Sequence, residues 1–224
     1  MESTREGIIA PSIRRLGEMA GLLYDRRFAA RAGKRTPLYY MHRAIARRGW
    51  LRYDITVIPP LMLGSEYNKT AGHYHSHARR GLSYPEVYEI LHGKATYILQ
   101  KKKKGGKKAK GELDDVILID AKEGDKILMP PNYGHVTVNR SPATLIMANI
   151  VSDRCVSDYS EYGALKGAAY YITKHGFVRN PSYKKVPPIR RQKPASPLPR
   201  ALSLFELLEN SSRSLKFIED PRLL

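Results

Sequence analysis

The chain has 224 residues, of which 42% are hydrophobic, and its 39 Lys and Arg against 21 Asp and Glu give a formal net charge of +18 at pH 7. This length allows one domain with extensions or two small domains. No run approaches the ~20 apolar residues of a membrane span, and none has the apolar segment of a signal peptide, so we expect no membrane partner. The only cysteine, Cys155, excludes an internal disulfide and is consistent with a reducing cytoplasm, where we expect the protein.

Residues 1–48 are expected to form an N-terminal helical or arm-like extension. Leu16, Met19, Ala20 and Leu23 recur at intervals of three and four residues, which is the spacing along one apolar face of a helix. This stretch therefore predicts one or two short helices ahead of the main domain.

Residues 49–178 have the pattern of a β-sheet domain. Short runs rich in β-branched and aromatic residues follow one another, with Gly, Pro, Asn and Asp between them: WLRYDITVIPP, EVYEILHG, KATYILQ, DVILIDA, KILMPP, HVTVN and TLIMANIV. Many short strands at regular spacing are typical of an antiparallel sandwich or barrel. The run KKKKGGKKAKG, residues 101–111, falls between two of these strands and is predicted to be an exposed hairpin loop.

Residues 179–224 form a basic, proline-rich tail in which the strand pattern stops. The spacing of its apolar residues predicts a short amphipathic helix from Leu204, Leu207, Leu208, Leu215, Phe217 and Ile218. Two interpretations stay open: a tail that packs back or stays mobile, and a dedicated docking element.

The excess positive charge stands out in the 101–111 loop and in residues 184–200. A basic surface attracts nucleic acid without sequence specificity, and it also attracts small phosphorylated anions. No helix-turn-helix or aromatic-rich RNA motif accompanies the charge. We therefore do not expect nucleic acid as the main partner, although the loop and the tail leave that class open.

The stretch GHYHSH, residues 72–77, places three histidines at alternate positions. On a strand, His73, His75 and His77 would share one face. Imidazole is the commonest protein ligand for transition metals, and two histidines at i and i+2 can bind one ion. An ordinary strand with surface or hydrogen-bonded histidines has the same pattern, so this stretch alone does not decide.

Further residues of the same chemistry follow. Glu86 opens the next strand, Gly93 closes it, and the run EGDKILMPPNYGHVTVN adds His135 and Asn139. The arrangement resembles the two signature motifs of the cupin superfamily. That resemblance implies an all-β fold, the cupin barrel (a double-stranded β-helix or jelly-roll-like barrel), here with N-terminal and C-terminal helical extensions.

The cupin resemblance implies four metal ligands, His73, His75, Glu86 and His135. They would hold one divalent transition metal per subunit. We expect Fe²⁺, with Mn²⁺, Ni²⁺ and Zn²⁺ as alternatives, because three imidazoles and a carboxylate suit these ions. The run SHARRGLSYP makes the spacing from His75 to Glu86 longer than in most cupins, and we interpret His77 as lying on this longer loop, outside the ligand set.

The flanking residues narrow the resemblance. SIRRLGEMAGLLYDRR, TAGHYH, PEVYEILHGKATYILQ and MPPNYGHVTVN, spread over about residues 10–165, together resemble the cupin-type glucose-6-phosphate isomerases of archaea. The resemblance implies a homodimer and a metal-dependent aldose–ketose isomerase of glycolysis and gluconeogenesis, which interconverts glucose 6-phosphate and fructose 6-phosphate. The lysine loop and the tail fall outside it.

The resemblance also assigns roles to single residues. Glu86 would be a catalytic base as well as a metal ligand, or a ligand only. The phosphorylated sugar would be bound by hydroxyl groups and by a backbone N–H close to a glycine, from Thr56, Thr70, Gly72, Tyr88 and Tyr159. Tyr88 could instead fill the barrel, and Thr56 could be a plain strand residue.

Two positions depart from the family. Its members commonly have a tyrosine and then a histidine ahead of Asp-Tyr, where this chain has Val151 and Ser157, and Tyr162 is a candidate to compensate. Two other function classes therefore stay open. One is another cupin enzyme, such as a dioxygenase or a sugar-phosphate epimerase or isomerase, and the other is a non-catalytic cupin that binds a sugar or nucleic acid.

Overall fold

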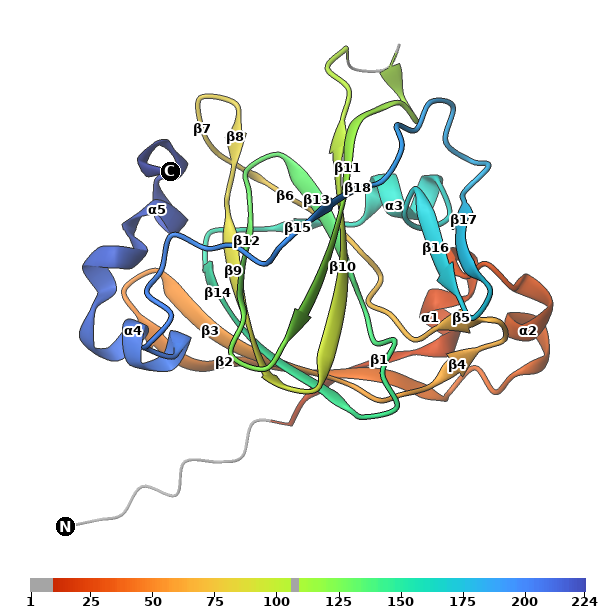
Figure 1. Ribbon diagram of the computed structural model, residues 1–224, viewed down its shortest axis with the longest axis horizontal. Helices are drawn as coiled ribbons and strands as arrows, with labels where there is room; N and C mark the ends of the chain where they lie inside the picture. The colour runs from red at the N-terminus through yellow and green to blue at the C-terminus, as the bar shows by residue number, and fades with distance from the viewer. Residues whose placement is uncertain (1–9, 106–108) are drawn as a thin grey trace.

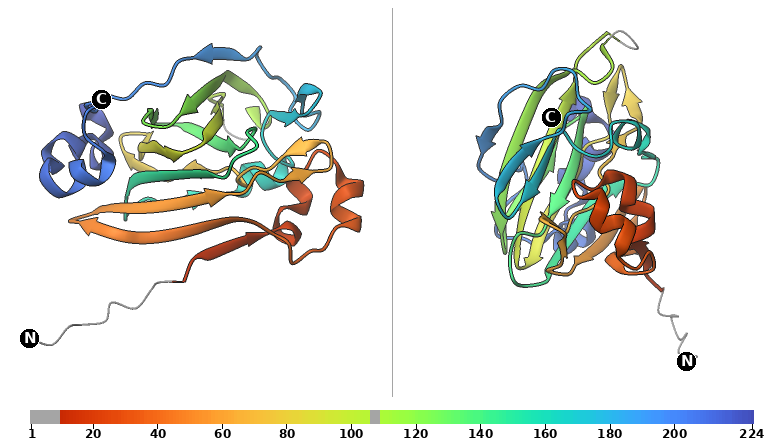
Figure 2. Two further views of the ribbon diagram at one scale, coloured as in Figure 1. Left: turned by 60° about the horizontal axis from the view of Figure 1, so that its bottom comes forward. Right: turned by 90° about the vertical axis from the view of Figure 1, so that its right-hand side faces the viewer.

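Two β-sheets lie face to face in the computed structural model, which describes residues 10–105 and 109–224 (Figures 1 and 2). The larger sheet has the order β1-β2-β3-β14-β9-β12, with β1 (Ser12–Arg15), β2 (Pro37–Arg48), β3 (Leu51–Ile58), β14 (Leu145–Ser152), β9 (Glu86–His92) and β12 (Lys126–Met129). The smaller sheet has the order β13-β10-β11-β18, with β13 (Tyr133–Val138), β10 (Lys94–Lys102), β11 (Leu113–Lys122) and β18 (Arg190–Gln192).

Shorter elements surround these two layers. The small sheets contain β4 (Met62–Leu63), β5 (Glu66–Tyr67), β16 (Tyr170–Thr173) and β17 (Gly176–Arg179); β6 (Tyr74–His75) with β15 (Ser157–Asp158); and β7 (His77–Arg79) with β8 (Leu82–Ser83). One end of the barrel carries α1 (Leu16–Met19), η1 (Ala20–Leu22), α2 (Arg26–Arg31) and α3 (Ser160–Ala164) (Figure 1). The opposite end carries α4 (Leu204–Asn210), η3 (Ser212–Leu215), α5 (Lys216–Glu219) and η4 (Pro221–Leu223). The prediction of an all-β cupin barrel with helical extensions is confirmed.

The central strands of the two large sheets are buried on both faces, because alternate residues of one strand enter different cores. On β10, Tyr97 and Leu99 belong to the core between the sheets, whereas Ile98 belongs to a second core beneath the segment of α3 and β16. On β14, Met147 faces the core between the sheets and Ile150 belongs to a third core under the C-terminal tail. Each such fully buried side chain contributes about 1.5–3 kcal/mol to folding.

The N-terminal extension is helical only in part. Leu16, Met19 and Leu23 are buried in the core between the sheets, which agrees with their helix-like spacing. Residues 37–48, however, form β2, which pairs with β3 across a turn at residues 49–50. The second half of β2 is mostly exposed and charged, so it lacks the apolar alternation by which a strand is recognised. The larger sheet therefore begins well before residue 49.

The lysine-rich segment joins two antiparallel partners, as predicted for a hairpin loop. β10 ends at Lys102 and β11 begins at Leu113. Residues 106–108 lie outside the described part of the chain. Lys103 forms an exposed ion pair with Glu112 at 2.8 Å, and Lys110 is also exposed. These described lysines are solvated and take no part in the core.

The C-terminal tail packs back on the barrel. It first adds a strand, β18, which pairs in parallel with β11, so the expectation that strand structure stops near residue 179 was wrong. Leu204, Leu207 and Leu208 are then fully buried against the outer face of the larger sheet. The carboxylate of Glu89 on β9 accepts a 2.7 Å hydrogen bond from the backbone N–H of Leu204 and so holds the start of α4.

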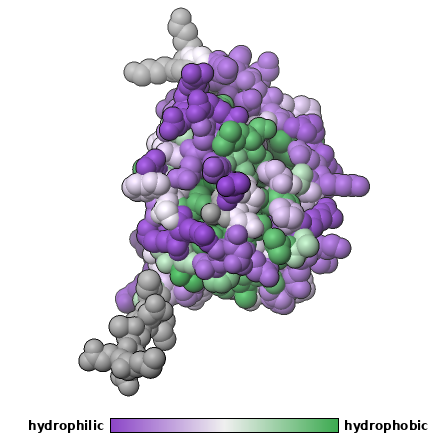
Figure 3. Space-filling view, turned by 90° about the vertical axis from the view of Figure 1, so that its left-hand side faces the viewer, coloured by the Kyte–Doolittle hydropathy of each residue, from purple (hydrophilic) through white to green (hydrophobic). Residues whose placement is uncertain are grey.

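The end of the molecule that carries α4 and α5 keeps some apolar surface. Figure 3 shows this side, where hydrophobic residues gather within a hydrophilic surround. The exposed apolar residues of the tail are Leu202, Phe205, Leu223 and Leu224. Among the described helices, none has the length and apolar character needed to cross a membrane.

Replacing Leu207 with alanine is expected to lower the free energy of unfolding by about 2–5 kcal/mol, because it leaves a cavity under α4. Leu207 is 0% exposed, whereas its neighbour Glu209 is exposed on the same helix. Urea titration of both alanine variants measures the effect, and the Glu209→Ala control should stay within about 0.5 kcal/mol of the parent. Equal stability of the two variants would show that the tail is not packed as described.

Candidate metal centre and its cavity

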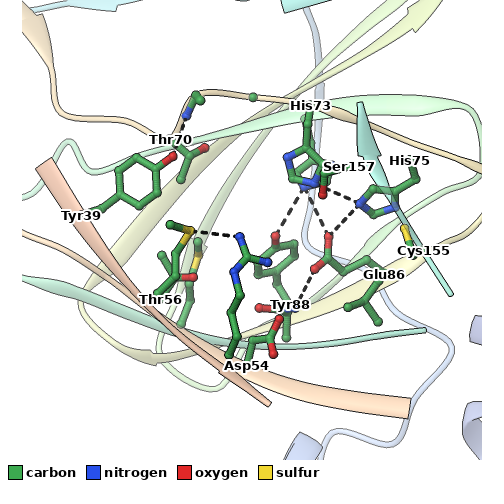
Figure 4. A pocket seen from close by; sticks show the side chains of 18 of the residues that line it. Tyr39, Asp54, Thr56, Thr70, His73, His75, Glu86, Tyr88, Cys155 and Ser157 are labelled. Atoms are coloured by element: carbon green, nitrogen blue, oxygen red, sulfur yellow. Dashed lines mark hydrogen bonds and ion pairs between the residues drawn. The ribbon is translucent and has the colours of Figure 1, made fainter. Parts of the chain in front are cut away.

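Three histidines and one glutamate converge between the two sheets, and Figure 4 labels three of the four, His73, His75 and Glu86. His73 and His135 form an antiparallel backbone bridge, and His75 follows on β6. Because side chains alternate along an extended segment, His73 and His75 face the cavity while Tyr74 between them is buried in the second core. Glu86 reaches the same point as the first residue of β9.

The four side chains are close enough to bind one ion. One potential ligand atom from each of His73, His75, Glu86 and His135 lies within 4.8 Å of all the others. The Nε2 atoms of His73 and His75 are 3.1 Å apart, and Glu86 Oε2 lies 3.3 Å from Nε2 of both His75 and His135. The sequence pattern predicted this set of four, and the fold brings all four together.

Neighbouring groups orient two of these side chains. The Nδ1 atom of His75 lies 2.8 Å from the backbone carbonyl of Tyr84, which accepts its hydrogen and leaves Nε2 free to bind a metal. The side-chain amide of Asn149 donates a 2.7 Å hydrogen bond to Oε1 of Glu86. The second carboxylate oxygen, Oε2, therefore faces the imidazoles.

Burial and mutual contacts shift the pKa values of this group. Burial lowers the pKa of His73 and of His135, and for His73 the neighbouring imidazoles lower it further. Burial alone would raise the pKa of Glu86, but its contacts with His135 and His75 outweigh burial and hold the pKa far below its usual range. Burial lowers the pKa of His75, yet Cys155 and the Glu86 carboxylate close beside it raise that pKa well above its usual value. The carboxylate is thus charged at neutral pH and the imidazoles of His73 and His135 are neutral, as metal ligands must be, whereas His75 would give up its Nε2 proton to an ion bound there.

The donor set fits a divalent transition metal. Glu86 Oε2 and His135 Nδ1 are buried and have no hydrogen-bond partner within the described residues. A buried carboxylate oxygen without a hydrogen bond is costly, and a cation beside it would remove that cost. Three nitrogens and one oxygen suit Fe²⁺, Mn²⁺, Ni²⁺ or Zn²⁺, and the donors do not choose among these ions.

The cavity beside the four side chains is also lined by every residue for which a contact with the substrate is predicted: Thr56, Thr70, Gly72, Tyr88 and Tyr159. Tyr88 is buried, and its hydroxyl lies 3.4 Å from Nε2 of His135. Tyr159 is 37% exposed, and its ring centre is 5.3 Å from that of His73. The fold gathers these residues in one cavity, and their roles stay predictions.

Gly72 allows the chain to approach two side chains closely beside the first histidine. Its φ is +77°, and a Cβ atom there would lie 2.4 Å from Cγ2 of Val136 and 2.6 Å from Cε1 of Tyr162. Tyr162 is therefore a packing residue beneath Gly72. It is fully buried and does not line the cavity, so the suggestion that it compensates for a missing cavity residue was wrong.

The two departures from the family pattern both lie at the site. Val151 and Ser157 line the cavity, from β14 and β15.

His77, the third histidine of the GHYHSH stretch, is exposed on β7 and is not part of the convergent group, as interpreted from the sequence.

The sequence interpretation missed several polar residues of the cavity. They are Arg43, Arg52, Asp54, Asn149 and Cys155. Asp54 is buried and accepts two hydrogen bonds from Nε of Arg52, at 2.9 and 3.0 Å, and one from the N–H of Ala44 at 2.7 Å. Arg52, Asp54 and Thr56 alternate along β3, so the inward face of this strand, read at every second position, was the signal available.

Comparison with known proteins gives a family match. The sequence model of "Glucose-6-phosphate isomerase (GPI)" matches residues 17–188. The chain is 29% identical over 181 residues to the glucose-6-phosphate isomerase of Pyrococcus furiosus, covering 78% of this chain and 88% of that protein. It is 29% identical over 150 residues to that of Thermococcus gammatolerans, covering 66% and 72%.

Solved structures with a similar arrangement include a Bacillus subtilis oxalate decarboxylase, with a TM-score of 0.37 and 16% identity over 53% of this chain and 27% of that one. A cupin superfamily protein from Desulfitobacterium hafniense has a TM-score of 0.32 and 13% identity over 51% and 76%.

Proposed function

Because this chain belongs to the glucose-6-phosphate isomerase family, we propose that it interconverts glucose 6-phosphate and fructose 6-phosphate and uses a divalent metal ion. The observation that carries the proposal is the convergence of three imidazoles and a carboxylate in a cavity that hydroxyl side chains also line. All these residues lie within the segment that the family model matches. The family match favours this isomerisation over the other cupin activities and over a non-catalytic cupin.

His73, His75, Glu86 and His135 are the residues that would hold the metal. When bound, a divalent ion supplies positive charge that polarises a carbonyl and stabilises developing oxyanion charge. Thr56, Thr70, Tyr159 and the backbone N–H of Gly72 would hold the phosphorylated sugar through hydrogen bonds.

The aldose–ketose conversion moves one carbon-bound hydrogen from C2 to C1 of the open-chain sugar and one proton from the C2 hydroxyl to the C1 oxygen, so that the carbonyl passes from C1 to C2. In a proton-transfer route, a base takes the proton from C2 and returns it to C1. Glu86 is the carboxylate of the convergent group and lines the cavity, so it is the proposed base for that route. In a hydride-transfer route, the hydrogen moves directly between the two carbons and Glu86 acts as a ligand only.

A coupled assay tests the proposal. With fructose 6-phosphate as substrate, glucose 6-phosphate formed by the protein is oxidised by its dehydrogenase and followed as NADPH. We expect turnover that a chelator abolishes and that added Fe²⁺, Mn²⁺, Ni²⁺ or Zn²⁺ restores, with mannose 6-phosphate run in parallel to define the substrate range. Absence of turnover in protein loaded with each of these ions would reject the proposed function.

Three finer attributes rest on the family resemblance and on composition. We propose Fe²⁺ as the native ion, a homodimer as the assembly, and the cytoplasm as the location. Elemental analysis of protein purified without added metal tests the first, light scattering tests the second, and cell fractionation tests the third.

A further inference from the structure

The two carboxylate oxygens of Glu86 have different neighbours. Its Oε2 faces the imidazoles of His75 and His135, 3.3 Å from each Nε2. Its Oε1 accepts a 2.7 Å hydrogen bond from the side-chain amide of Asn149. Both residues are only 4% exposed, so bulk water has little access to replace this contact.

The backbone holds the donor in a fixed place. Asn149 lies within β14, a strand paired on both sides, opposite Asp54 on β3 and opposite Tyr88 on β9. Glu86 lies two residues from Tyr88 on β9 and shares its face, so it is the diagonal neighbour of Asn149. Because both ladders fix β14, the amide is aimed from a rigid part of the sheet.

A free carboxylate could turn about its terminal bond and offer either oxygen, or both, to an ion. A buried N–H donor on one oxygen removes that freedom and stabilises the ionised form. We propose that Asn149 is a positioning residue, which fixes Glu86 as a metal ligand that binds through Oε2 alone. The inference rests on the proposed metal centre. It gives a positioning role to Asn149, a residue that the sequence pattern did not identify.

Partners that orient a metal ligand matter for affinity nearly as much as the ligand itself, and their loss costs about 10–100-fold in metal affinity or activity. Asn149→Ala is therefore expected to weaken metal binding by about 10–100-fold. Asn149→Leu has nearly the same size but no hydrogen-bond donor, so it should weaken binding at least as much. A residue needed only to fill space would show a different order, with the leucine tolerated and the alanine not.

Metal-free protein of each variant is titrated with Mn²⁺, and the free ion is followed by its electron paramagnetic resonance signal. The control is Val151→Ala, because Val151 lies two residues along β14 and lines the same cavity but has no hydrogen-bond donor in its side chain. It should bind Mn²⁺ within about twofold of the parent protein, since no ligand-orienting hydrogen bond is lost. Circular dichroism confirms that every variant is folded.

An Asn149→Leu affinity within twofold of the parent protein would overturn the inference. An at least tenfold loss in both Asn149 variants, with the control unchanged, would support it. Metal titration needs no turnover, so the two proposals fail separately: a parent protein without isomerase activity rejects the proposed function, and unchanged Mn²⁺ binding in the variants rejects the role of Asn149.

Discussion

Replacing His135 with alanine is expected to remove most of the bound metal from the purified protein and to lower kcat/KM for the sugar phosphate by about 10³-fold. Metal charge stabilisation is worth several kcal/mol in the transition state, and ~4 kcal/mol corresponds to a factor of ~10³ in rate. His135 is 2% exposed, and its Nε2 lies 3.3 Å from Glu86 Oε2 at the centre of the group. Elemental analysis and the coupled assay measure the two effects.

The matched control is His77→Ala. His77 is a histidine of the same GHYHSH stretch, but it is exposed and outside the convergent group. Its loss should leave metal content and turnover unchanged. If the His135 variant kept a full complement of metal, His135 would leave the ligand set, and if the His77 variant lost metal, the assignment of the stretch would be wrong.

Replacing Gly72 with alanine is expected to destabilise the folded protein by about 2–5 kcal/mol. A left-handed backbone costs a non-glycine residue about 1–2 kcal/mol, and overpacking a core costs about 1–3 kcal/mol more. Both costs apply, because φ is +77° and the new Cβ would meet Val136 and Tyr162 at 2.4 and 2.6 Å. Thermal unfolding should show a fall in Tm on the order of 10 °C.

Gly124→Ala separates the two costs. Gly124 has a φ of +79°, nearly the same as Gly72, but among the described residues none apart from its two chain neighbours has an atom within 4 Å of the position of its Cβ. Its alanine variant should lose only the backbone part, about 1–2 kcal/mol. Equal destabilisation at both positions would mean that the contacts with Val136 and Tyr162 do not restrict residue 72.

Much of the fold was predictable because core strands carry a strong local signal. The runs KATYILQ and DVILIDA became β10 and β11, whose residues are buried on both faces. β18 could not be found in this way. Its three residues are all exposed, and it is held by parallel backbone pairing with β11 and by the ion pair between Arg190 and Asp115 at 2.7 Å, none of which needs an apolar pattern.

The four convergent side chains were predictable because their chemistry is rare and their spacing is distinctive. The other polar residues that line the cavity could not be predicted in this way. Asp54 and Asn149 lie within strands that also carry core residues, and although Arg52, Asp54 and Thr56 alternate along β3, the alternation does not tell which face of the strand is turned to the cavity. Their position is decided by pairing between β3 and β14, segments about ninety residues apart in the chain. Only the assembled sheet shows that they face the site.

The four convergent residues come from both layers of the barrel. Glu86 belongs to the larger sheet, while His135 belongs to the smaller one and is bridged to His73. An ion held by all four would therefore act as a cross-link, and thermodynamic linkage follows, because the unfolded chain has no such site. A free ion concentration of 100 times Kd would add about 2.7 kcal/mol to the free energy of unfolding. The supply of metal in the cell would thus set how many molecules stay folded as well as how many are active.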